Sequence, residues 1–234
     1  MAAEDTTPQL PLALNLRQRR DFASFIPRGN EALVASLQHL ADGADEALFL
    51  RGEAGSGRTH LLEATVNRVM DRGGQGCLLP AAELRTLTPA VLDGMEVHDL
   101  VALDDLDQLA GRQDWEEALF HCYNRCRAAG TAWLAAAKQG PRHLGLALPD
   151  LATRLASGGV YQVRALDEDG LLALLEQRAD ARGLALDPEV ARYMVRRHER
   201  SPAALCETMD RLDRQALARK RRLTLPFVKE VLQW

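Results

Sequence analysis

Short apolar runs recur along the first two thirds of the chain, and segments with helical patterning separate them. The apolar runs lie at residues 47–50, 76–79, 100–103 and 131–137. The helical segments lie from residue 61 to the glycines at 73 and 74, near 81–87 and over 114–128. Strands that alternate with helices in this way predict an α/β domain whose parallel sheet is covered on both faces.

The character of the sequence changes near residues 164–165, after which every segment is patterned as a helix. Asp167, Asp187 and Ser201 are predicted N-caps, and proline follows the last two of them. A fourth helix is expected from near Pro226. Four short helices with apolar stripes predict a small bundle. We therefore expect a tail (1–20), an α/β domain (21–165) and a helical domain (166–234).

Composition limits the class of protein. The 234 residues are 47% hydrophobic and 26% charged, which is enough to bury a sizeable core. The net charge of −4 disfavours a dedicated DNA-binding protein and favours a protein partner. No apolar run approaches the ~18 residues of a membrane span, and the polar N-terminus is unlike a signal peptide, so we expect a cytoplasmic protein.

The four cysteines lack the paired spacing of a metal site. Cys122 and Cys126 lie four residues apart on one predicted helix, with only His121 beside them. Buried free thiols are favoured over a metal or redox site.

A glycine-rich segment, GEAGSGRT at residues 52–59, lies between the first apolar run and the first helix. This is the context of a P-loop, in which backbone N–H groups and the helix dipole face a phosphate. Glycines would let the backbone approach the phosphates, and the hydroxyl of Thr59 would reach Mg²⁺. The candidate nucleotide contacts are Gly52, Glu53, Ala54, Gly55, Ser56, Gly57, Arg58, Thr59 and His60. A loop that is glycine-rich by chance is the alternative.

Arg58 stands where a P-loop normally has lysine. The charge is retained, but a planar guanidinium with five donors does not reproduce the compact contact of an ammonium with the outer phosphates. We therefore expect nucleotide binding without fast hydrolysis. The C-terminal bundle is interpreted as a lid over this site.

Two acids follow the apolar run at residues 100–103. Open α/β sheets bind ligands at the carboxyl ends of their strands, so Asp104 is the candidate Mg²⁺ ligand and Asp105 the candidate for polarising a water. Taken alone, a strand that ends in Asp-Asp is more often a helix N-cap. The basic run at 219–222 is interpreted as a solvated helix end that interacts with the helix dipole, and not as a nucleic-acid patch.

Together these segments resemble the AAA+ ATPases of the replication-initiator branch, and most closely the Hda family, which inactivates the bacterial initiator DnaA. The resemblance is carried by QLPLAL (9–14), GEAGSGRTHLL (52–62), LVALDDLDQLAG (100–111), ALFHCYNRCRAAG (118–130), LALPDLATRL (146–155) and RKRRLTLPFVKEVL (219–232). No DNA-reading helix-turn-helix domain is expected after the lid.

The resemblance implies three roles. Gln9, Leu10, Leu12 and Leu14 are similar to a hexapeptide that binds the sliding clamp, the beta subunit of DNA polymerase III. Arg154, in a short helical segment after the fourth strand, aligns with an arginine finger offered to the nucleotide of a neighbouring subunit. The P-loop would hold ADP, or ATP, with Mg²⁺. The alternatives are an ordinary strand or docking tail at residues 9–14 and a local ion pair between Arg154 and Asp150.

The sequence also departs from the family. The strand at 133–138 has no Ser, Thr or Asn where AAA+ proteins place a polar sensor of the γ-phosphate. Ala203 or Ala204 falls where a second sensor arginine is expected, and only Arg200 lies nearby. We therefore expect little intrinsic ATPase activity.

The resulting hypothesis is a negative regulator of replication initiation that, on the DNA-loaded clamp, stimulates hydrolysis of ATP bound to DnaA and leaves inactive ADP-DnaA. One alternative is a DnaA-associated accessory or recruitment factor that does not stimulate hydrolysis. Another is an autonomous AAA+ ATPase of the loader type. A homo-oligomer is compatible with each.

Overall fold

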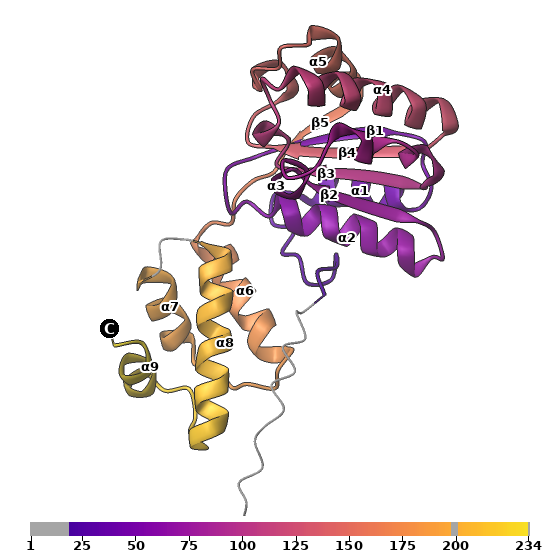
Figure 1. Cartoon of the computed structure of the whole chain (residues 1–234). Coiled ribbons are helices and arrows are strands. Elements are labelled where there is room, and N and C mark those ends of the chain that lie inside the picture. Colours follow the sequence, from indigo (N-terminus) through magenta and orange to yellow (C-terminus); the bar gives the residue numbers. More distant parts are fainter. Residues whose placement is uncertain (1–18, 198–200, 234) are drawn as a thin grey trace, which may run out of the picture.

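The computed structural model describes residues 19–197 and 201–233 in two parts, a sheet domain and a C-terminal helical bundle (Figure 1). The predicted clamp-binding residues at 9–14 and Arg200 lie outside this range. Five parallel strands form one sheet in the order β2-β3-β4-β1-β5. The strands are β1 (Ala47–Arg51), β2 (Gly76–Pro80), β3 (Leu100–Asp104), β4 (Ala132–Ala137) and β5 (Gly159–Gln162).

Helices cover both faces of this sheet, as the alternating pattern predicts. The helices of this domain are α1 (Glu31–Ala41), α2 (Arg58–Asp71), α3 (Ala81–Leu84), α4 (Gln113–Ala129) and α5 (Pro149–Ala156). In Figure 1, α1 and α2 pack on one face and α4 and α5 on the other. The sequence did not predict α1 or β5.

The central strands are apolar on both faces because each face has its own core. In β4, Trp133 packs toward α4, where its ring lies edge-on to Tyr123 with 5.3 Å between centroids. The neighbouring Leu134 packs toward α1 and α2. Side chains of a strand alternate between faces, so a strand buried on both sides becomes a continuous apolar run.

Cys122 and Cys126 lie in the core under α4, and both are fully buried. Their Sγ atoms are 3.9 Å apart and both thiols are free. The hydrogen bond that the Cys122 thiol makes with Cys126, together with burial, raises the pKa of Cys122. No cluster of three or more metal-ligating side chains occurs in the described ranges. The pair therefore fits the interpretation as buried thiols.

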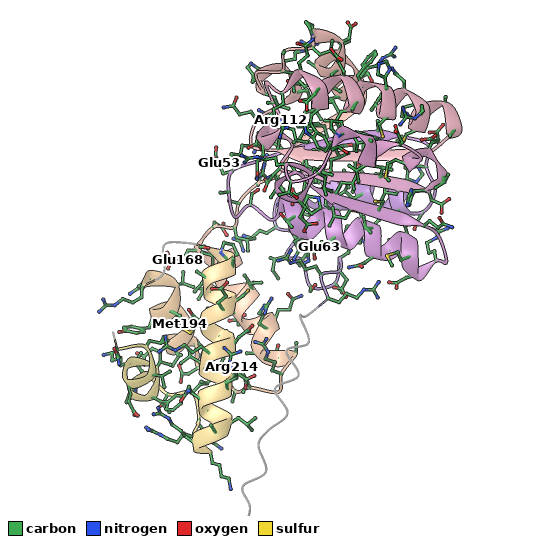
Figure 2. All side chains as sticks on the ribbon, in the orientation of Figure 1. Glu53, Glu63, Arg112, Glu168, Met194 and Arg214 are labelled. Carbon is green, nitrogen blue, oxygen red and sulfur yellow. The ribbon has the colours of Figure 1, made fainter. Side chains whose placement is uncertain are left out.

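Within the described residues the bundle contains four helices, and the predicted caps Asp167 and Ser201 are formed. The helices are α6 (Glu168–Asp180), α7 (Pro188–Arg197), α8 (Pro202–Arg219) and α9 (Leu225–Leu232). The side chain of Asp167 accepts a hydrogen bond from the Gly170 N–H at 2.8 Å, and Ser201 accepts one from the Ala204 N–H at 3.3 Å. Side chains fill the interior, where the labelled Met194 is fully buried (Figure 2).

The basic run at 219–222 is tied to the last helix. Arg219 and Arg221 each donate to Glu230, at 2.5 Å and 2.8 Å, and both guanidinium groups lie over the Phe227 ring. Two of its four charges therefore stabilise the packing of α8 against α9. These contacts differ from the predicted interaction with the helix dipole, but like it they are formed within the bundle.

A few polar contacts connect the two parts. Arg28 forms ion pairs with Asp167 at 3.0 Å and Asp169 at 2.9 Å. Asn30 is 3% exposed; its amide donates to the Arg164 carbonyl at 3.0 Å, and its Oδ1 accepts from the Arg164 N–H at 2.8 Å. The start of α6 is thereby fixed to the sheet domain. Within the described residues, no helix has the length and apolarity to cross a bilayer.

Candidate nucleotide site and exposed arginine

The glycine-rich loop connects the carboxyl end of β1 to the first turn of α2. Gly55 and Gly57 have φ of +78° and +100°, which other residues adopt only with strain. A Cβ at Gly52 would lie 2.7 Å from Ser56 Oγ and 2.9 Å from the Val163 carbonyl, so this close turn also requires glycine. The strand, loop and helix of a P-loop are therefore present in the predicted order.

The first turn of α2 is open to an anion. Its N-cap is Gly57, which provides no side chain to the first N–H groups, and the turn holds no acidic residue. Unpaired N–H groups and the positive end of the helix dipole make such a turn a ready anion site.

The loop side chains contact the two acids after β3. Arg58 Nη2 donates to Asp105 Oδ1 at 2.8 Å, and Thr59 Oγ1 donates to Asp104 Oδ2 at 2.5 Å. Because β1, β4 and β3 are parallel neighbours, their carboxyl ends share one edge of the sheet, and the predicted residues meet there although they are far apart in sequence.

The environments of the two acids differ. Asp104 is 6% exposed, and its Oδ1 accepts the Asp105 backbone N–H at 2.9 Å. Asp105 has a φ of 50°, in the left-handed region. Burial and the charge of Asp104 raise the pKa of Asp105, and Arg58 opposes that shift.

Two buried polar atoms next to the loop have no hydrogen-bond partner among the described residues, Ser56 Oγ and Arg58 Nη1. Donors of this kind, together with the open first turn of α2, fit the phosphates of a nucleotide. The Thr59 hydroxyl and the Asp104 carboxylate are adjacent oxygen donors of the type that Mg²⁺ prefers. When bound, Mg²⁺ would neutralise phosphate charge.

The sensor positions contain apolar side chains. All six residues of β4 are buried and apolar, so its carboxyl end presents no polar side chain to the site. On the lid, the start of α8 faces the loop, because a Cβ built at Gly55 would lie 3.7 Å from Pro202 Cδ. The next residue, Ala203, has no polar group to direct at a phosphate.

The side chain of His60 is directed away from the loop. Its Nε2 lies 2.8 Å from the Asp21 carbonyl oxygen, and its ring packs 5.4 Å from that of Phe25. Burial lowers the pKa of His60. Any contact of His60 with a phosphate would therefore be through its backbone.

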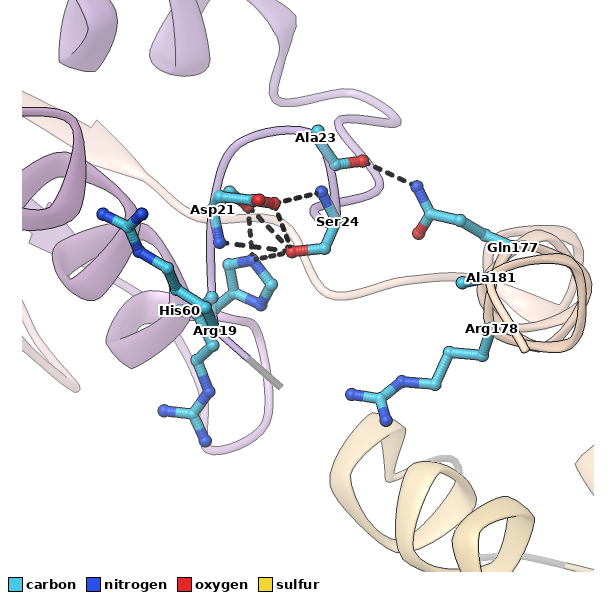
Figure 3. Close-up of a pocket in the computed structure, with 9 residues that line it drawn as sticks. Arg19, Asp21, Ala23, Ser24, His60, Gln177, Arg178 and Ala181 are labelled. Carbon is cyan, nitrogen blue, oxygen red and sulfur yellow. Dashed lines mark hydrogen bonds between the residues drawn. The ribbon is translucent and has the colours of Figure 1, made fainter. Parts of the chain in front are cut away.

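His60 instead lines a cleft of about 220 Å³ between the start of the described chain and α6 (Figure 3). Arg19 and Arg178 border this cleft, but each pairs with a carboxylate outside it, Asp71 at 2.7 Å and Asp210 at 3.5 Å. The amide of Gln177 donates to the Ala23 carbonyl across the cleft at 2.7 Å. Arg20, which also lines the cleft, pairs with Glu63, so each arginine that the structure describes around this cleft is compensated.

Arg154 lies in the last turn of α5, where it is exposed. Its side chain forms no ion pair or hydrogen bond within the described part of the chain, and the alternative pair with Asp150 is not formed.

The corner after α5 lies at the amino ends of the strands, opposite the P-loop. Gly159 starts β5 beside Leu48, near the amino end of β1, whereas the loop follows the carboxyl end. A five-residue strand spans about 16 Å. Gly158 fixes the corner, because a Cβ there would collide with the Ala47 carbonyl oxygen. The last turn of α5, which carries Arg154, therefore leads to the amino ends of the strands, whereas the P-loop follows their carboxyl ends.

A comparison with known proteins concerns the bundle and the fold. Residues 167–232 match the model of a family described as "Hda, lid domain". The match covers the C-terminal bundle. The bundle follows a five-stranded parallel-sheet domain, and this combination is consistent with the Hda/DnaA family.

Solved structures have a fold similar to that of the sheet domain and helical bundle together. Domain III of DnaA from Thermotoga maritima has a TM-score of 0.80 at 19% identity, over 92% of this chain and 96% of that one. AMPPCP-bound DnaA from Aquifex aeolicus has a TM-score of 0.68 at 20% identity, over 86% of this chain and 65% of that one. The Holliday junction branch migration motor RuvB from Thermotoga maritima has a TM-score of 0.70 at 14% identity, over 92% of this chain and 71% of that one.

Proposed function

We propose that this protein inactivates DnaA by presenting Arg154 to ATP bound in DnaA, while it is itself held on the DNA-loaded sliding clamp. ATP hydrolysis would leave inactive ADP-DnaA. The attacking water and the Mg²⁺ belong to the partner's site in this proposal, and this chain contributes a positive charge.

The observation that supports this role most is the position of Arg154. The residue is exposed and has no partner among the described residues, and its helix leads to the end of the sheet opposite the P-loop. A guanidinium in this position can contact the nucleotide of a neighbouring subunit. Arginine fingers raise rates in related hydrolases by roughly 10³–10⁵-fold, which corresponds to about 4–7 kcal/mol of barrier.

The protein's own nucleotide would have a structural role. The AMPPCP-bound DnaA structure has the same fold, and the open first turn of α2 fits a phosphate. We propose ADP, held by the loop at 52–59 with Mg²⁺ at Thr59 and Asp104. The apolar end of β4 and Ala203 disfavour the alternative of an autonomous ATPase.

Recruitment to the clamp is assigned to Gln9, Leu10, Leu12 and Leu14, on the resemblance of their sequence alone. Burial of three leucines contributes about 1.5–3 kcal/mol each, whereas ordering a tail costs on the order of 1–2 kcal/mol per residue. Weak, reversible binding follows.

The decisive experiment measures turnover of DnaA-bound ATP with and without this protein on clamp-loaded DNA. Arg154→Ala should remove the stimulation. Arg85→Ala is the matched control, because Arg85 is also exposed but follows α3, beside the other edge strand, β2. Unchanged stimulation by Arg154→Ala would assign the finger to another residue, with the exposed Arg142 as the next candidate. Absence of stimulation by the wild type would favour an accessory factor.

A further inference from the structure

We propose that Asp105 competes with nucleotide phosphate for Arg58, and thereby determines how tightly this protein holds ADP. The inference rests on the nucleotide-binding part of the proposed function. It is independent of Arg154 and of DnaA.

The guanidinium of Arg58 has little freedom. Its side chain is 8% exposed, and Nη2 is held by Asp105 Oδ1 at 2.8 Å. Nη1 is buried with no partner among the described residues. A buried charged donor without a partner is costly, so one half of Arg58 is satisfied by Asp105 and the other half is available to an acceptor.

Two adjacent carboxylates from the end of β3 lie beside the loop. Asp105 binds Arg58, and Asp104 accepts a hydrogen bond from the neighbouring Thr59. A diphosphate that enters here brings further negative charge to the same guanidinium. Phosphate must therefore either displace Asp105 from Arg58 or share Arg58 with a like charge nearby, and both lower affinity.

This role differs from activation of a water by Asp105. A carboxylate that polarises water needs its oxygens directed at the reacting phosphate, whereas Oδ1 is engaged by the P-loop arginine. If competition dominates, removal of the Asp105 charge should strengthen nucleotide binding. If Asp105 acts through Mg²⁺ or water, its removal should weaken binding or leave it unchanged.

The informative variant is Asp105→Asn. Asparagine tolerates the left-handed backbone that residue 105 adopts at φ 50°, so the substitution removes charge without new strain. Asp105→Gly is the second variant, since glycine adopts this φ freely and removes the side chain.

Asp107→Asn provides a matched control. Asp107 lies two residues further along, and its Oδ1 accepts the Lys138 backbone N–H at 3.1 Å, a bond that an asparagine oxygen can retain. The same unit of charge is removed near the loop, but from a residue that does not bind Arg58.

ADP affinity of the purified full chain is measured by calorimetry, both with Mg²⁺ and with EDTA. We expect Asp105→Asn to bind ADP about tenfold more tightly, which corresponds to ~1.4 kcal/mol, in both conditions. Asp107→Asn should give a clearly smaller gain. In an Arg58→Ala background, Asp105→Asn should give none.

Unchanged or weaker ADP binding by both Asp105 variants overturns the inference, as does a gain that persists without Arg58. If the wild type binds no measurable ADP and Asp105→Asn does bind it, the inference is supported. If none of the variants binds ADP, the inference is overturned. DnaA-bound ATP turnover is a separate readout, so failure of the finger assignment is distinguishable from failure here.

Discussion

Gly158→Ala should move Arg154 without changing it. The Cβ introduced at residue 158 collides with the Ala47 carbonyl oxygen, which is backbone and cannot rotate away. The residue is not in the left-handed region, so the whole effect is steric. Either β1 or the corner between α5 and β5 must shift, and α5 carries Arg154.

The magnitude follows from these contacts. Overpacking of this kind costs about 1–3 kcal/mol, and for a chain of this size each kcal/mol lowers the unfolding temperature by about 2–4 °C. A displacement of about 1 Å at a catalytic group costs roughly 10²-fold in rate. Gly158→Ala should therefore unfold a few degrees earlier and lose most of its stimulation of DnaA-bound ATP hydrolysis, even well below its unfolding temperature.

Calorimetric unfolding and the DnaA turnover assay on clamp-loaded DNA measure the two effects on the same preparation. Gly140→Ala is the control, because a Cβ there would meet only the Arg51 side chain at an ordinary 3.5 Å. Wild-type stimulation by a destabilised Gly158→Ala would refute the idea that this corner positions the finger.

Three further predictions concern the finger, the tail and the loop. Arg154→Lys keeps the charge but loses the planar fork, so it should stimulate almost as poorly as Arg154→Ala, with unchanged unfolding; near wild-type turnover would mean that charge alone suffices. Gln9→Ala combined with Leu12→Ala should abolish co-elution with the clamp without changing the unfolding temperature, and retained co-elution would exclude the tail. Arg58→Ala should weaken ADP binding in calorimetry, and wild-type ATP turnover should be far slower than that of ordinary ATPases; rapid turnover would show that the missing sensors are dispensable.

The sequence predicts the sheet domain well where burial is complete. β3 and β4 are buried on both faces, so their apolar runs are unbroken and the prediction is confirmed. β5 was not predicted because it is an edge strand with alternating half-buried and exposed residues, and it contains no apolar run. α1 was not predicted either, although Leu33, Leu37 and Leu40 have helical spacing.

The residues of the candidate site can be predicted from the sequence, but the contacts between them cannot. Glycines identify the loop because its backbone shape requires them, and a carboxylate at the end of a strand identifies Asp104 because a metal site requires its charge. The pair of Arg58 with Asp105 spans 47 positions and depends on which rotamer the guanidinium adopts. Parallel strand order brings both residues to one edge, but it does not determine which acid the arginine selects.

Two kinds of contact of different strength join the sheet domain to the lid. The buried side-chain amide of Asn30 forms two hydrogen bonds with the backbone of Arg164 and holds the junction at this point. Arg28 forms ion pairs with Asp167 and Asp169, whose side chains are 62% and 71% exposed. Exposed ion pairs contribute little to stability and weaken as salt is added. Added salt should therefore weaken the Arg28 ion pairs before the Asn30 hydrogen bonds, and the approach of Pro202 to the phosphate loop should loosen while Asn30 still holds the junction.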